Sequence, residues 1–582
     1  MRNLSEPMGS IIRPSTTRRR FVLGMAASGV AAALPRAGAW AAAGEPGALT
    51  GPEVDLDIAP LPVNFTGQPR IATAINGSVP GPLLRWREGD EVRIRVGNRL
   101  AVPTSVHWHG IILPAAMDGA PGFSFTGIDP GESFEYRFRL RQNGTYWYHS
   151  HSGFQEQTGH YGPIVILPRD PAQIGAERDH VVMLSDWSDE DPVAVLRTLK
   201  KQADYYNRHQ RTVGDFLRDA REQGWRKAAA DSLAWGGMRM NRTDLADVSG
   251  VTYTYLVNGM TPAGNWTALY RRGERVRLRF INAGAMTIFD VRIPGLSLTV
   301  VAADGKELDP VTVEEFRIAP GETYDVIVKP ADESAYTIFA QAADRSGYAR
   351  ATLAPRQGMS APVPEPDRRV ALSMADMGHG ASTEHAGHEG HDMGPPSYAV
   401  LPAGIHHAPT EFGVSVDMRV ATPSARLDVP GVGLRDNGRR VLTYADLASR
   451  FPDPDGREPG RTIELHLTGN MERYLWSFNG VGFMEAEPLR FNYGERLRIV
   501  LVNDTMMEHP IHLHGMWSDL ENEQGQFQVR KHTINVLPGH LNSFRVTADA
   551  LGRWPFHCHL MLHMENSMFL PVIVDEEGRH EA

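Results

Sequence analysis

The chain has 582 residues, of which 42% are hydrophobic and 22% charged, a composition that excludes a disordered polyelectrolyte and a membrane helix bundle. A formal net charge of -10 argues against nucleic acid as a partner, because a phosphate backbone requires a basic surface. Cys558 is the single cysteine, which excludes intrachain disulfides and leaves a thiol that is structural, catalytic or a metal ligand.

Residues 1–43 are predicted to be an export signal. Three consecutive arginines, Arg18 to Arg20, precede an apolar run that ends near Leu34, and small residues follow up to Ala43. This order is typical of a twin-arginine signal peptide, which sends folded proteins to the periplasm. The apolar run is shorter than the roughly 20 residues needed to cross a bilayer, and no later segment is long enough. We therefore expect the twin-arginine export machinery as a partner, a periplasmic location and no stable membrane span.

One pattern then recurs three times along the chain, in residues 76–96, 258–280 and 479–501. Each copy begins with an Asn-Gly turn and continues into a strand in which apolar and polar residues alternate. A Pro-Gly turn and a second alternating strand follow in every copy. Alternating strands separated by Gly and Pro turns favour β-sandwiches or barrels. The repeats therefore predict three related all-β domains.

We place these domains at residues 50–170, 175–354 and 401–577. Residues 190 to about 232 lack regular turns and predict short helices inserted in the second domain. Residues 355–400 are rich in Pro, Gly, His and Met, which predicts a mobile linker between the second and third domains.

The linker also contains a cluster of imidazoles and thioethers. Soft thioether sulfur favours Cu(I), so the cluster predicts copper binding; the alternative is a polar tether without metal. The candidate linker ligands are Met374, Met377, His379, His385, His388, His391 and Met393.

Four short histidine motifs lie towards the two ends of the folded region and contain ten of the 23 histidines. On a strand, alternate side chains share a face, so a His-x-His pair presents two imidazoles to one side. A single pair would also fit surface histidines or a hydrolase metal site, but four motifs together predict a metal centre. The motifs are His107-Trp108-His109, His149-Ser150-His151, residues 509–515 and residues 557–563.

The last motif indicates two metal sites on one strand, because alternation sends Cys558 to one face and both His557 and His559 to the other. A thiolate, two imidazoles and a weak axial thioether form the ligand set of a blue-copper site. The alternative for the thioether of Met568 is packing in an apolar strand. The remaining eight histidines predict a second centre, for which imidazole alone does not choose between copper, iron and zinc. The residues that supply the blue-copper set are His509, Cys558, His563 and Met568.

Together the four motifs resemble those of the multicopper oxidases, three-domain cupredoxin proteins related to laccase. The resemblance implies three cupredoxin-like Greek-key domains and four copper ions, with the blue-copper set holding type 1 copper. It places type 2 copper at His107 and His512, and a trinuclear cluster between the first and third domains, with the second domain as a spacer. The implied ligands of the binuclear type 3 site are His109, His149, His151, His514, His557 and His559.

The same resemblance implies a reaction with O2, which is reduced to water by electrons taken singly from a reducing substrate. The electrons would pass from Cys558 to His557 and His559. Reduction of O2 also needs protons, and Asp118 matches the position of the family's carboxylate beside the cluster; the alternative is that Asp118 is only a turn residue. Some relatives have an acidic residue directly after the histidine that corresponds to His563, whereas this chain has Met564 there. Glu565 is the candidate to replace that acid in the proton route.

Within the family, the chain is similar to the copper-resistance oxidases of the CopA type, in residues 235–241, residues 503–509 and the linker. This similarity implies oxidation of Cu(I) to the less permeant Cu(II). The alternatives are a laccase-like phenol oxidase and a non-enzymatic copper buffer, and oxidation of manganese or iron stays open. The candidate substrate ligands, for which interface packing of the methionines is the alternative, are Asp504, Met506, Met507 and Glu508.

Overall fold

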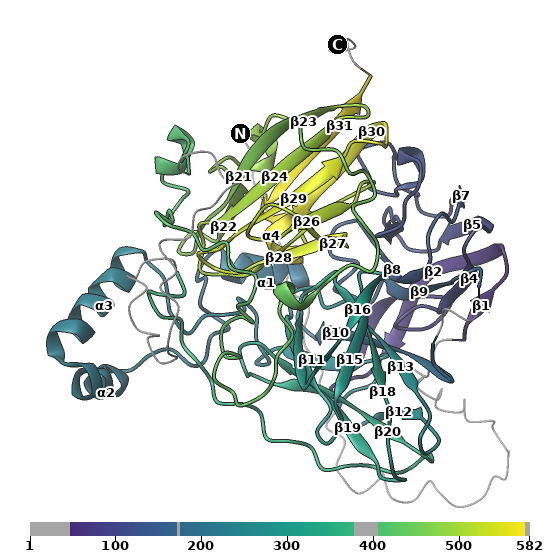
Figure 1. Ribbon diagram of the computed structural model, residues 1–582, viewed down its shortest axis with the longest axis horizontal. Coiled ribbons are helices and arrows are strands. Elements are labelled where there is room, and N and C mark those ends of the chain that lie inside the picture. Colours follow the sequence, from purple (N-terminus) through teal and green to yellow (C-terminus); the bar gives the residue numbers. More distant parts are fainter. Residues whose placement is uncertain (1–46, 171–174, 378–404, 577–582) are drawn as a thin grey trace, which may run out of the picture. The chain divides into compact units, whose positions relative to one another are not determined.

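The computed structural model describes residues 47–170, 175–377 and 405–576, and these residues are mostly β-sheet (Figure 1). The predicted signal at residues 1–43 lies outside them. In the described residues the strands form six sheets, two in each of three successive parts of the chain. No helix in these ranges is long and apolar enough to cross a membrane.

The first domain pairs a four-stranded sheet, β3-β2-β5-β7, with a five-stranded sheet, β1-β4-β9-β8-β6. In β5, Val92, Ile94 and Val96 are buried and the charged residues between them are exposed, as the alternating pattern predicts. The strands are β1 (Leu49–Thr50), β2 (Glu53–Val63), β3 (Arg70–Ile75), β4 (Leu84–Arg87), β5 (Glu91–Asn98), β6 (His107–His109), β7 (Ser133–Arg139), β8 (Gly144–His149) and β9 (Tyr161–Leu167), with the 3-10 helix η1 (Ala115–Met117).

The second domain has sheets in the order β11-β10-β13-β18-β15-β16 and β12-β20-β19-β14-β17. Its strands are β10 (Arg178–Ser188), β11 (Tyr253–Val257), β12 (Trp266–Leu269), β13 (Val276–Asn282), β14 (Phe289–Arg292), β15 (Leu298–Ala303), β16 (Lys306–Val313), β17 (Glu315–Ile318), β18 (Thr323–Val328), β19 (Tyr336–Ala342) and β20 (Tyr348–Ala354).

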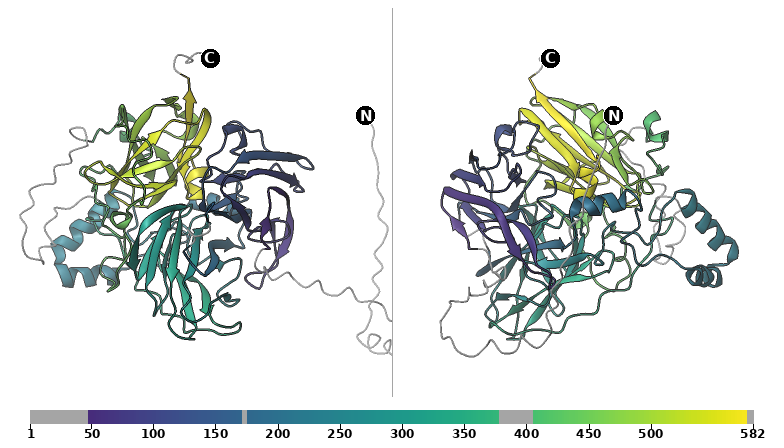
Figure 2. Two further views of the ribbon diagram at one scale, coloured as in Figure 1. Left: turned by 45° about the vertical axis from the view of Figure 1, so that its right-hand side comes forward. Right: turned by 180° about the vertical axis from the view of Figure 1, so that it is seen from behind.

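Three helices lie between β10 and β11, α1 (Pro192–Leu199), α2 (Val213–Gln223) and α3 (Trp225–Gly237), so the helical segment extends five residues beyond the predicted end. Asp191 caps α1 by accepting a hydrogen bond from the Ala194 amide at 2.9 Å. Figures 1 and 2 show α2 and α3 standing apart from the sheets.

The third domain repeats the arrangement with sheets β22-β21-β24-β29-β26-β27 and β23-β31-β30-β25-β28. Its elements are η3 (Pro409–Phe412), η4 (Tyr444–Asp446), β21 (Arg461–Asn470), β22 (Leu475–Phe478), η5 (Phe483–Glu485), β23 (Leu489–Asn492), β24 (Arg496–Asn503), β25 (His509–Leu513), β26 (Ser518–Glu521), β27 (Phe527–Lys531), β28 (Thr533–Val536), β29 (Leu541–Thr547), β30 (Gly552–Cys558), α4 (Met561–Glu565) and β31 (Phe569–Asp575).

In contrast to β5, the repeated strand of the second domain, β13, is buried along its whole length. Its polar residues Arg277 and Arg279 face Asp325, and Arg279 also donates to Thr145 of the first domain at 2.8 Å. Paired charges can be buried where an unpaired charge would be too costly. The alternating arginines of β13 are thus buried in ion pairs, and Arg279 also contacts the first domain.

The described part of the predicted linker, residues 355–377, has no helix or strand but is attached to the second and third domains. Asp367 accepts hydrogen bonds from Gln341 at 2.7 Å and from Arg292 at 3.2 Å. Met377 is fully buried in the hydrophobic core. This part differs from the expected free tether, because apolar burial and charged hydrogen bonds hold it in place.

Candidate metal centres

Four strands carry the histidine motifs. β6 pairs with β8 so that His107 lies opposite His149, and β25 pairs with β30 so that His512 lies opposite His557. Opposite residues of an antiparallel pair project to the same face of the sheet. The first and third domains therefore each present a set of imidazoles on one face.

These two sets of imidazoles meet each other. Nε2 of His557 lies 3.1 Å from Nε2 of His514 and 3.4 Å from Nε2 of His151. The rings of His107 and His514 stack with their centroids 3.8 Å apart. Residues about 400 positions apart in the sequence thus line one buried centre, as the positions of the motifs at the two chain ends predict.

Several ring nitrogens in this centre are buried without a hydrogen-bond partner. Leaving a buried polar atom unsatisfied costs about 1–3 kcal/mol, and native proteins seldom do so. Unprotonated imidazole nitrogens are also the donor atoms that copper binds. The centre therefore fits the trinuclear copper cluster that the family resemblance implies. The unpartnered nitrogens are Nε2 of His107, His149 and His512, Nδ1 of His109 and both nitrogens of His559.

Except in His559, the opposite nitrogens of these rings lie next to oxygen atoms. Nδ1 of His149 lies 2.7 Å from the Glu156 carboxylate, and Nδ1 of His512 lies 2.6 Å from the backbone carbonyl of His532. Metal-binding histidines commonly donate their second N–H in this way, which fixes the tautomer and the ring orientation. The surrounding chain therefore directs the free nitrogens towards the centre.

Asp118 is buried and touches two of the cluster histidines. Its carboxylate lies 2.8 Å from Nδ1 of His514 and 3.3 Å from Nδ1 of His107. The next residue, Gly119, has a φ of +80°, and a Cβ there would lie 1.8 Å from the carbonyl oxygen of Val106. Asp118 is thus a turn residue and a neighbour of the cluster at once, so the two alternatives for it are compatible.

Two residues next to the cluster, Glu156 and His532, were not predicted from the sequence. Burial, followed by the charges of Asp186 and Glu565, raises the pKa of Glu156 well above its usual range. Nδ1 of His532 lies 3.2 Å from Nε2 of His109. Neither residue belongs to a His-x-His pair or another recognisable spacing, so only the folded chain reveals them.

The mononuclear centre lies on the other side of the same strand. Sγ of Cys558 is 3.5 Å from Nδ1 of His509 and 3.8 Å from Nδ1 of His563, and the two nitrogens are 3.2 Å apart. All three residues are fully buried, and burial raises the pKa of the thiol. One sulfur and two nitrogens in a triangle of this size fit the trigonal ligand set of blue copper.

The outer nitrogens of these two imidazoles are also occupied. Nε2 of His509 lies 2.7 Å from the hydroxyl of Thr505, and Nε2 of His563 donates to the Asp247 carboxylate at 2.6 Å. Each ring therefore has its Nε2 side fixed by an oxygen and its Nδ1 side turned towards the sulfur of Cys558.

Met568 is buried beside the cysteine and the second imidazole. Its backbone carbonyl accepts a hydrogen bond from the Cys558 amide at 3.1 Å, and its amide donates to the His563 carbonyl at 2.9 Å. These two bonds hold the methionine next to both residues. Core packing and a place beside the ligands are therefore compatible for Met568.

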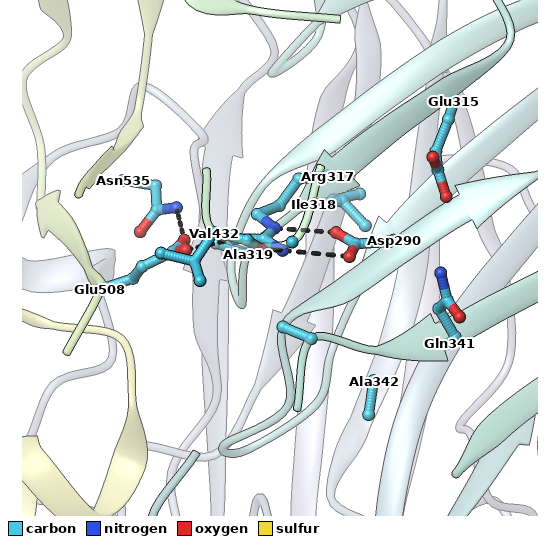
Figure 3. A network of polar contacts seen from close by, with 12 residues as sticks. Asp290, Glu315, Arg317, Ile318, Ala319, Gln341, Ala342, Val432, Glu508 and Asn535 are labelled. Carbon is cyan, nitrogen blue, oxygen red and sulfur yellow. Dashed lines mark hydrogen bonds and ion pairs between the residues drawn. The ribbon is translucent and has the colours of Figure 1, made fainter. Parts of the chain in front are cut away.

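The four candidate substrate ligands do not form one site. Asp504 is fully buried and accepts hydrogen bonds from His466 at 2.6 Å and from the Val420 amide at 2.7 Å. Figure 3 shows Glu508 engaged by Arg317 of the second domain and by Asn535, whose amide donates at 2.6 Å. The structure thus uses both carboxylates for internal contacts.

The two methionines of this group are buried, and they differ in their surroundings. Met507 lines a small cavity of about 10 Å³ together with Met286 and Asp247, whereas Met506 is not among the residues that line it. A larger neighbouring cavity of about 210 Å³ shares Asp247 and Asp344 with the small one and is also lined by Asp244. Asp247 therefore connects these cavities to the mononuclear centre.

Asp247 is the third residue that the sequence analysis did not identify. Its Oδ2 atom contacts His563, while its Oδ1 atom is buried without a hydrogen-bond partner. Burial and the charge of Asp247 raise the pKa of the adjacent Asp244 well above its usual range. Arg208, Arg211 and Arg369 line the larger cavity as well, and Asp247 is the lining residue that contacts His563.

Two of the candidate linker ligands lie in the described residues, and the Met377 amide donates a hydrogen bond to the Met374 carbonyl at 3.2 Å. Met374 is partly buried against the core and Met377 is fully buried in it. Burial of the thioethers in the core explains why these two are not exposed to an incoming ion. The other five candidates, His379, His385, His388, His391 and Met393, lie outside the described residues.

The copper-free protein should lose stability as the pH falls below about 6.5. Burial first, and neighbouring imidazoles second, hold the pKa of most cluster histidines well below 6.5. The unfolded chain then takes up protons that the folded chain cannot, which costs about 1.4 kcal/mol per group one pH unit below that value. The histidines concerned are His109, His149, His151, His512, His514 and His559.

Urea unfolding of the copper-free protein at a series of pH values between about 7.5 and 5.5 measures this effect. We expect the midpoint to fall steadily below about pH 6.5. A midpoint that stays constant over this interval would show that the histidines are protonated in the folded chain.

Known protein families and relatives match the chain along most of its length. Three multicopper oxidase family models match residues 57–171, 178–358 and 456–578. The chain is 58% identical to "Copper resistance protein A homolog" of Pseudomonas syringae pv. tomato and 55% identical to "Copper resistance protein A" of Escherichia coli. Each comparison covers 96% of this chain and 99% of the relative.

Solved structures resemble the fold at low sequence identity. The laccase of Botrytis aclada is 20% identical with a TM-score of 0.63, over 92% of this chain and 90% of the laccase. Fet3p, described as a multicopper oxidase that functions in iron import, is 18% identical with a TM-score of 0.63, over 90% and 91% of the two chains. The predicted fold of three cupredoxin-like domains is confirmed, and the chain belongs to the multicopper oxidase family, in the group of copper resistance protein A.

Proposed function

We propose that the protein is a periplasmic oxidase that converts Cu(I) to Cu(II) at the expense of O2 and so confers copper resistance. The observation that carries this proposal is the contact of Asp247, which lines both cavities, with the outer nitrogen of His563. The names of the relatives, which are copper resistance proteins at 55–58% identity, support a role in copper resistance.

The lining of the cavities suits a cuprous ion. The buried carboxylate of Asp247 attracts a cation, and an incoming ion would displace the proton that burial and Asp247 favour on Asp244. The thioethers of Met286 and Met507 in the adjoining small cavity are soft ligands, which favour Cu(I) over Cu(II). An ion bound there would lie one side chain away from His563.

The chain also provides the connection between the two centres. Bound copper supplies the redox chemistry, one-electron oxidation of the substrate and four-electron reduction of O2 to water. Peptide bonds join Cys558 directly to His557 and His559, so the backbone at the end of β30 is the shortest covalent path from one ligand set to the other. Each O2 consumes four cuprous ions and four protons and yields two water molecules.

Asp118 has a positioning role in this proposal. Its carboxylate holds the Nδ1 side of His514, which leaves Nε2 of that ring facing His557. Its second contact, with His107, fixes a ring from the other domain in the same way. One buried carboxylate thus orients a ligand from each half of the cluster.

For location, we propose export to the periplasm by the twin-arginine machinery, on the basis of the arginine triplet and the apolar run in residues 1–43. Export of a folded protein suits a chain whose metal ligands come from both ends of its sequence. Detection of the protein in the periplasmic fraction, and its loss when Arg18 and Arg19 are replaced by lysine, tests this route.

Oxygen uptake tests the substrate. We expect added Cu(I) to drive uptake well above the spontaneous rate, and Met507→Leu to lower this rate about tenfold, which corresponds to about 1.4 kcal/mol of lost binding to the ion. A Met-to-Leu exchange keeps the buried volume, so the fold should survive. Oxidation of a phenol, which needs no thioether, should change little.

Met506→Leu is the matched control, because Met506 is equally buried on the same loop but does not line the small cavity. It should leave both rates near those of the unchanged protein. No uptake with Cu(I) above background would instead favour a copper-binding protein without oxidase activity, and phenol turnover without any cuprous activity would favour a laccase-like enzyme.

Cys558→Ser should abolish the blue absorption and reduce oxygen uptake below detection, because a hydroxyl does not replace the thiolate in a blue-copper ligand set. The side chain is similar in size, so the far-ultraviolet circular dichroism should be unchanged. Visible absorption and oxygen uptake measure the outcome. Turnover that persists without the blue centre would show that electrons reach the cluster by another path.

Asp118→Asn should lower oxygen uptake about 10- to 100-fold, the usual cost of losing a partner that orients a metal ligand. The mononuclear centre is formed by other residues, so its blue absorption should persist. Copper analysis shows whether the cluster still fills. An unchanged rate with full copper occupancy would remove the positioning role of Asp118.

A further inference from the structure

A second cluster of imidazoles and carboxylates lies in the third domain, outside both copper centres. It consists of His407, Glu411 on η3, His466 on β21 and Asp504 directly after β24. Glu411, His466 and Asp504 are buried, whereas His407 retains a partly exposed side chain. The cluster therefore has a route to solvent through His407.

The four side chains place their donor atoms around a common point. Nδ1 of His407 is 2.7 Å from Oε2 of Glu411 and 3.6 Å from Oδ2 of Asp504. Nδ1 of His466 is 2.6 Å from Oδ2 of Asp504 and 3.5 Å from Oε2 of Glu411. Tetrahedral ligands with bonds of about 2.0–2.1 Å lie about 3.3 Å apart, so a small expansion of the two short contacts makes room for an ion.

The remaining atoms of both imidazoles have partners outside the cluster. Nε2 of His407 lies 3.2 Å from the Val420 carbonyl, and Nε2 of His466 lies 3.1 Å from the Glu464 carboxylate. A proton on each Nε2 leaves each Nδ1 free to bind a metal. Acceptors at the second nitrogen are the usual support of metal-binding histidines.

Each of the two carboxylates likewise uses one oxygen for a contact outside the cluster and the other for a contact within it. Oε1 of Glu411 accepts a hydrogen bond from the Ala408 amide at 3.1 Å, and Oδ1 of Asp504 accepts one from the Val420 amide at 2.7 Å. The other oxygen of each group is the one that faces the imidazoles. Every member of the cluster is thus fixed by one atom and directs a second atom inward.

We propose that His407, Glu411, His466 and Asp504 bind one divalent first-row transition-metal ion, additional to the four coppers of the oxidase. Two imidazole nitrogens and two carboxylate oxygens are ligands that Zn²⁺ and Cu²⁺ accept. A divalent ion also balances the two carboxylate charges when both imidazoles are neutral, which makes the buried set electrically neutral.

In the absence of an ion, the same residues form an ion-pair network. Burial opposes the charge on His466, but Asp504, Glu411 and Glu464 outweigh it and raise the pKa of His466 to about 9. Metal binding then has to displace a proton. If the cluster binds a metal ion, the chain holds one more ion than if the cluster stays a protonated ion-pair network.

The site adjoins the mononuclear centre through the chain. Asp504 is followed by Thr505, whose hydroxyl lies 2.7 Å from Nε2 of His509. An ion held by Asp504 would therefore anchor the start of the loop that supports a blue-copper ligand. Its occupancy need not change the oxidase reaction for the site to exist.

The experiment uses the copper-loaded protein. It is exposed to excess Zn²⁺, and unbound metal is then removed. Zinc is the probe because it is distinguishable from the resident copper. We expect His407→Gln and Glu411→Gln to hold one zinc ion per chain fewer than the unchanged protein, by elemental analysis. His406→Gln is the matched control, since His406 is the exposed neighbour of His407 and should keep the full zinc content.

Anomalous diffraction at the zinc edge, from a crystal of the unchanged protein soaked in Zn²⁺, provides a measurement that does not depend on a variant folding. We expect a peak within about 2.1 Å of the four donor atoms. Equal zinc contents in all four proteins, or anomalous peaks at other histidines only, would overturn the proposal and leave the cluster as an ion-pair network. Blue absorption and oxygen uptake, measured in parallel, report separately on the oxidase.

Discussion

Both centres depend on the end of strand β30, where Cys558 points to one face and the histidines on either side of it point to the other. Antiparallel pairing with β25 sets Cys558 opposite Ile511 and His557 opposite His512, and β31 pairs along the other edge. A slip of one residue would send the thiol to the cluster and its neighbours away from it. Pairing on both sides of β30 therefore fixes the ligand sets as well as the fold.

The second domain does more than separate the other two domains. It supplies no copper ligand in the implied sets, but its residues contact the mononuclear centre. Asp247 orients His563, and Arg317 holds Glu508 next to His509. The backbone carbonyl of Ala285 accepts a hydrogen bond from Met561 at 2.8 Å, at the start of the helix α4 that carries His563. The mononuclear centre is thus enclosed by two domains.

The parts that could be predicted from the sequence are those with a local period or a short spacing. Alternation in β5 predicts its buried face, and the His-x-His pairs predict the strands that meet at the cluster. The sequence reasoning failed where a contact joins remote positions. Asp247 lies 316 residues from His563, and no local pattern relates an isolated aspartate to a ligand that far away.

The candidate substrate ligands show that closeness in sequence can also mislead. Asp504 and Glu508 lie near His509 in the sequence, but in the folded chain they contact His466 and Arg317. Proximity along an irregular loop does not decide the direction of a side chain, since each peptide there adopts its own dihedral angles.

The energetics of the cluster link copper binding to the docking of the first and third domains. Unpartnered nitrogens from both ends of the chain are brought together in a buried centre, and each costs free energy until a ligand satisfies it. Copper binding offsets this cost only once the first and third domains have docked, since neither domain alone holds the whole set. Binding and docking are therefore coupled. A route that exports the folded chain would preserve this coupling, whereas threading an unfolded chain would separate the ligands and require the cluster to assemble afterwards.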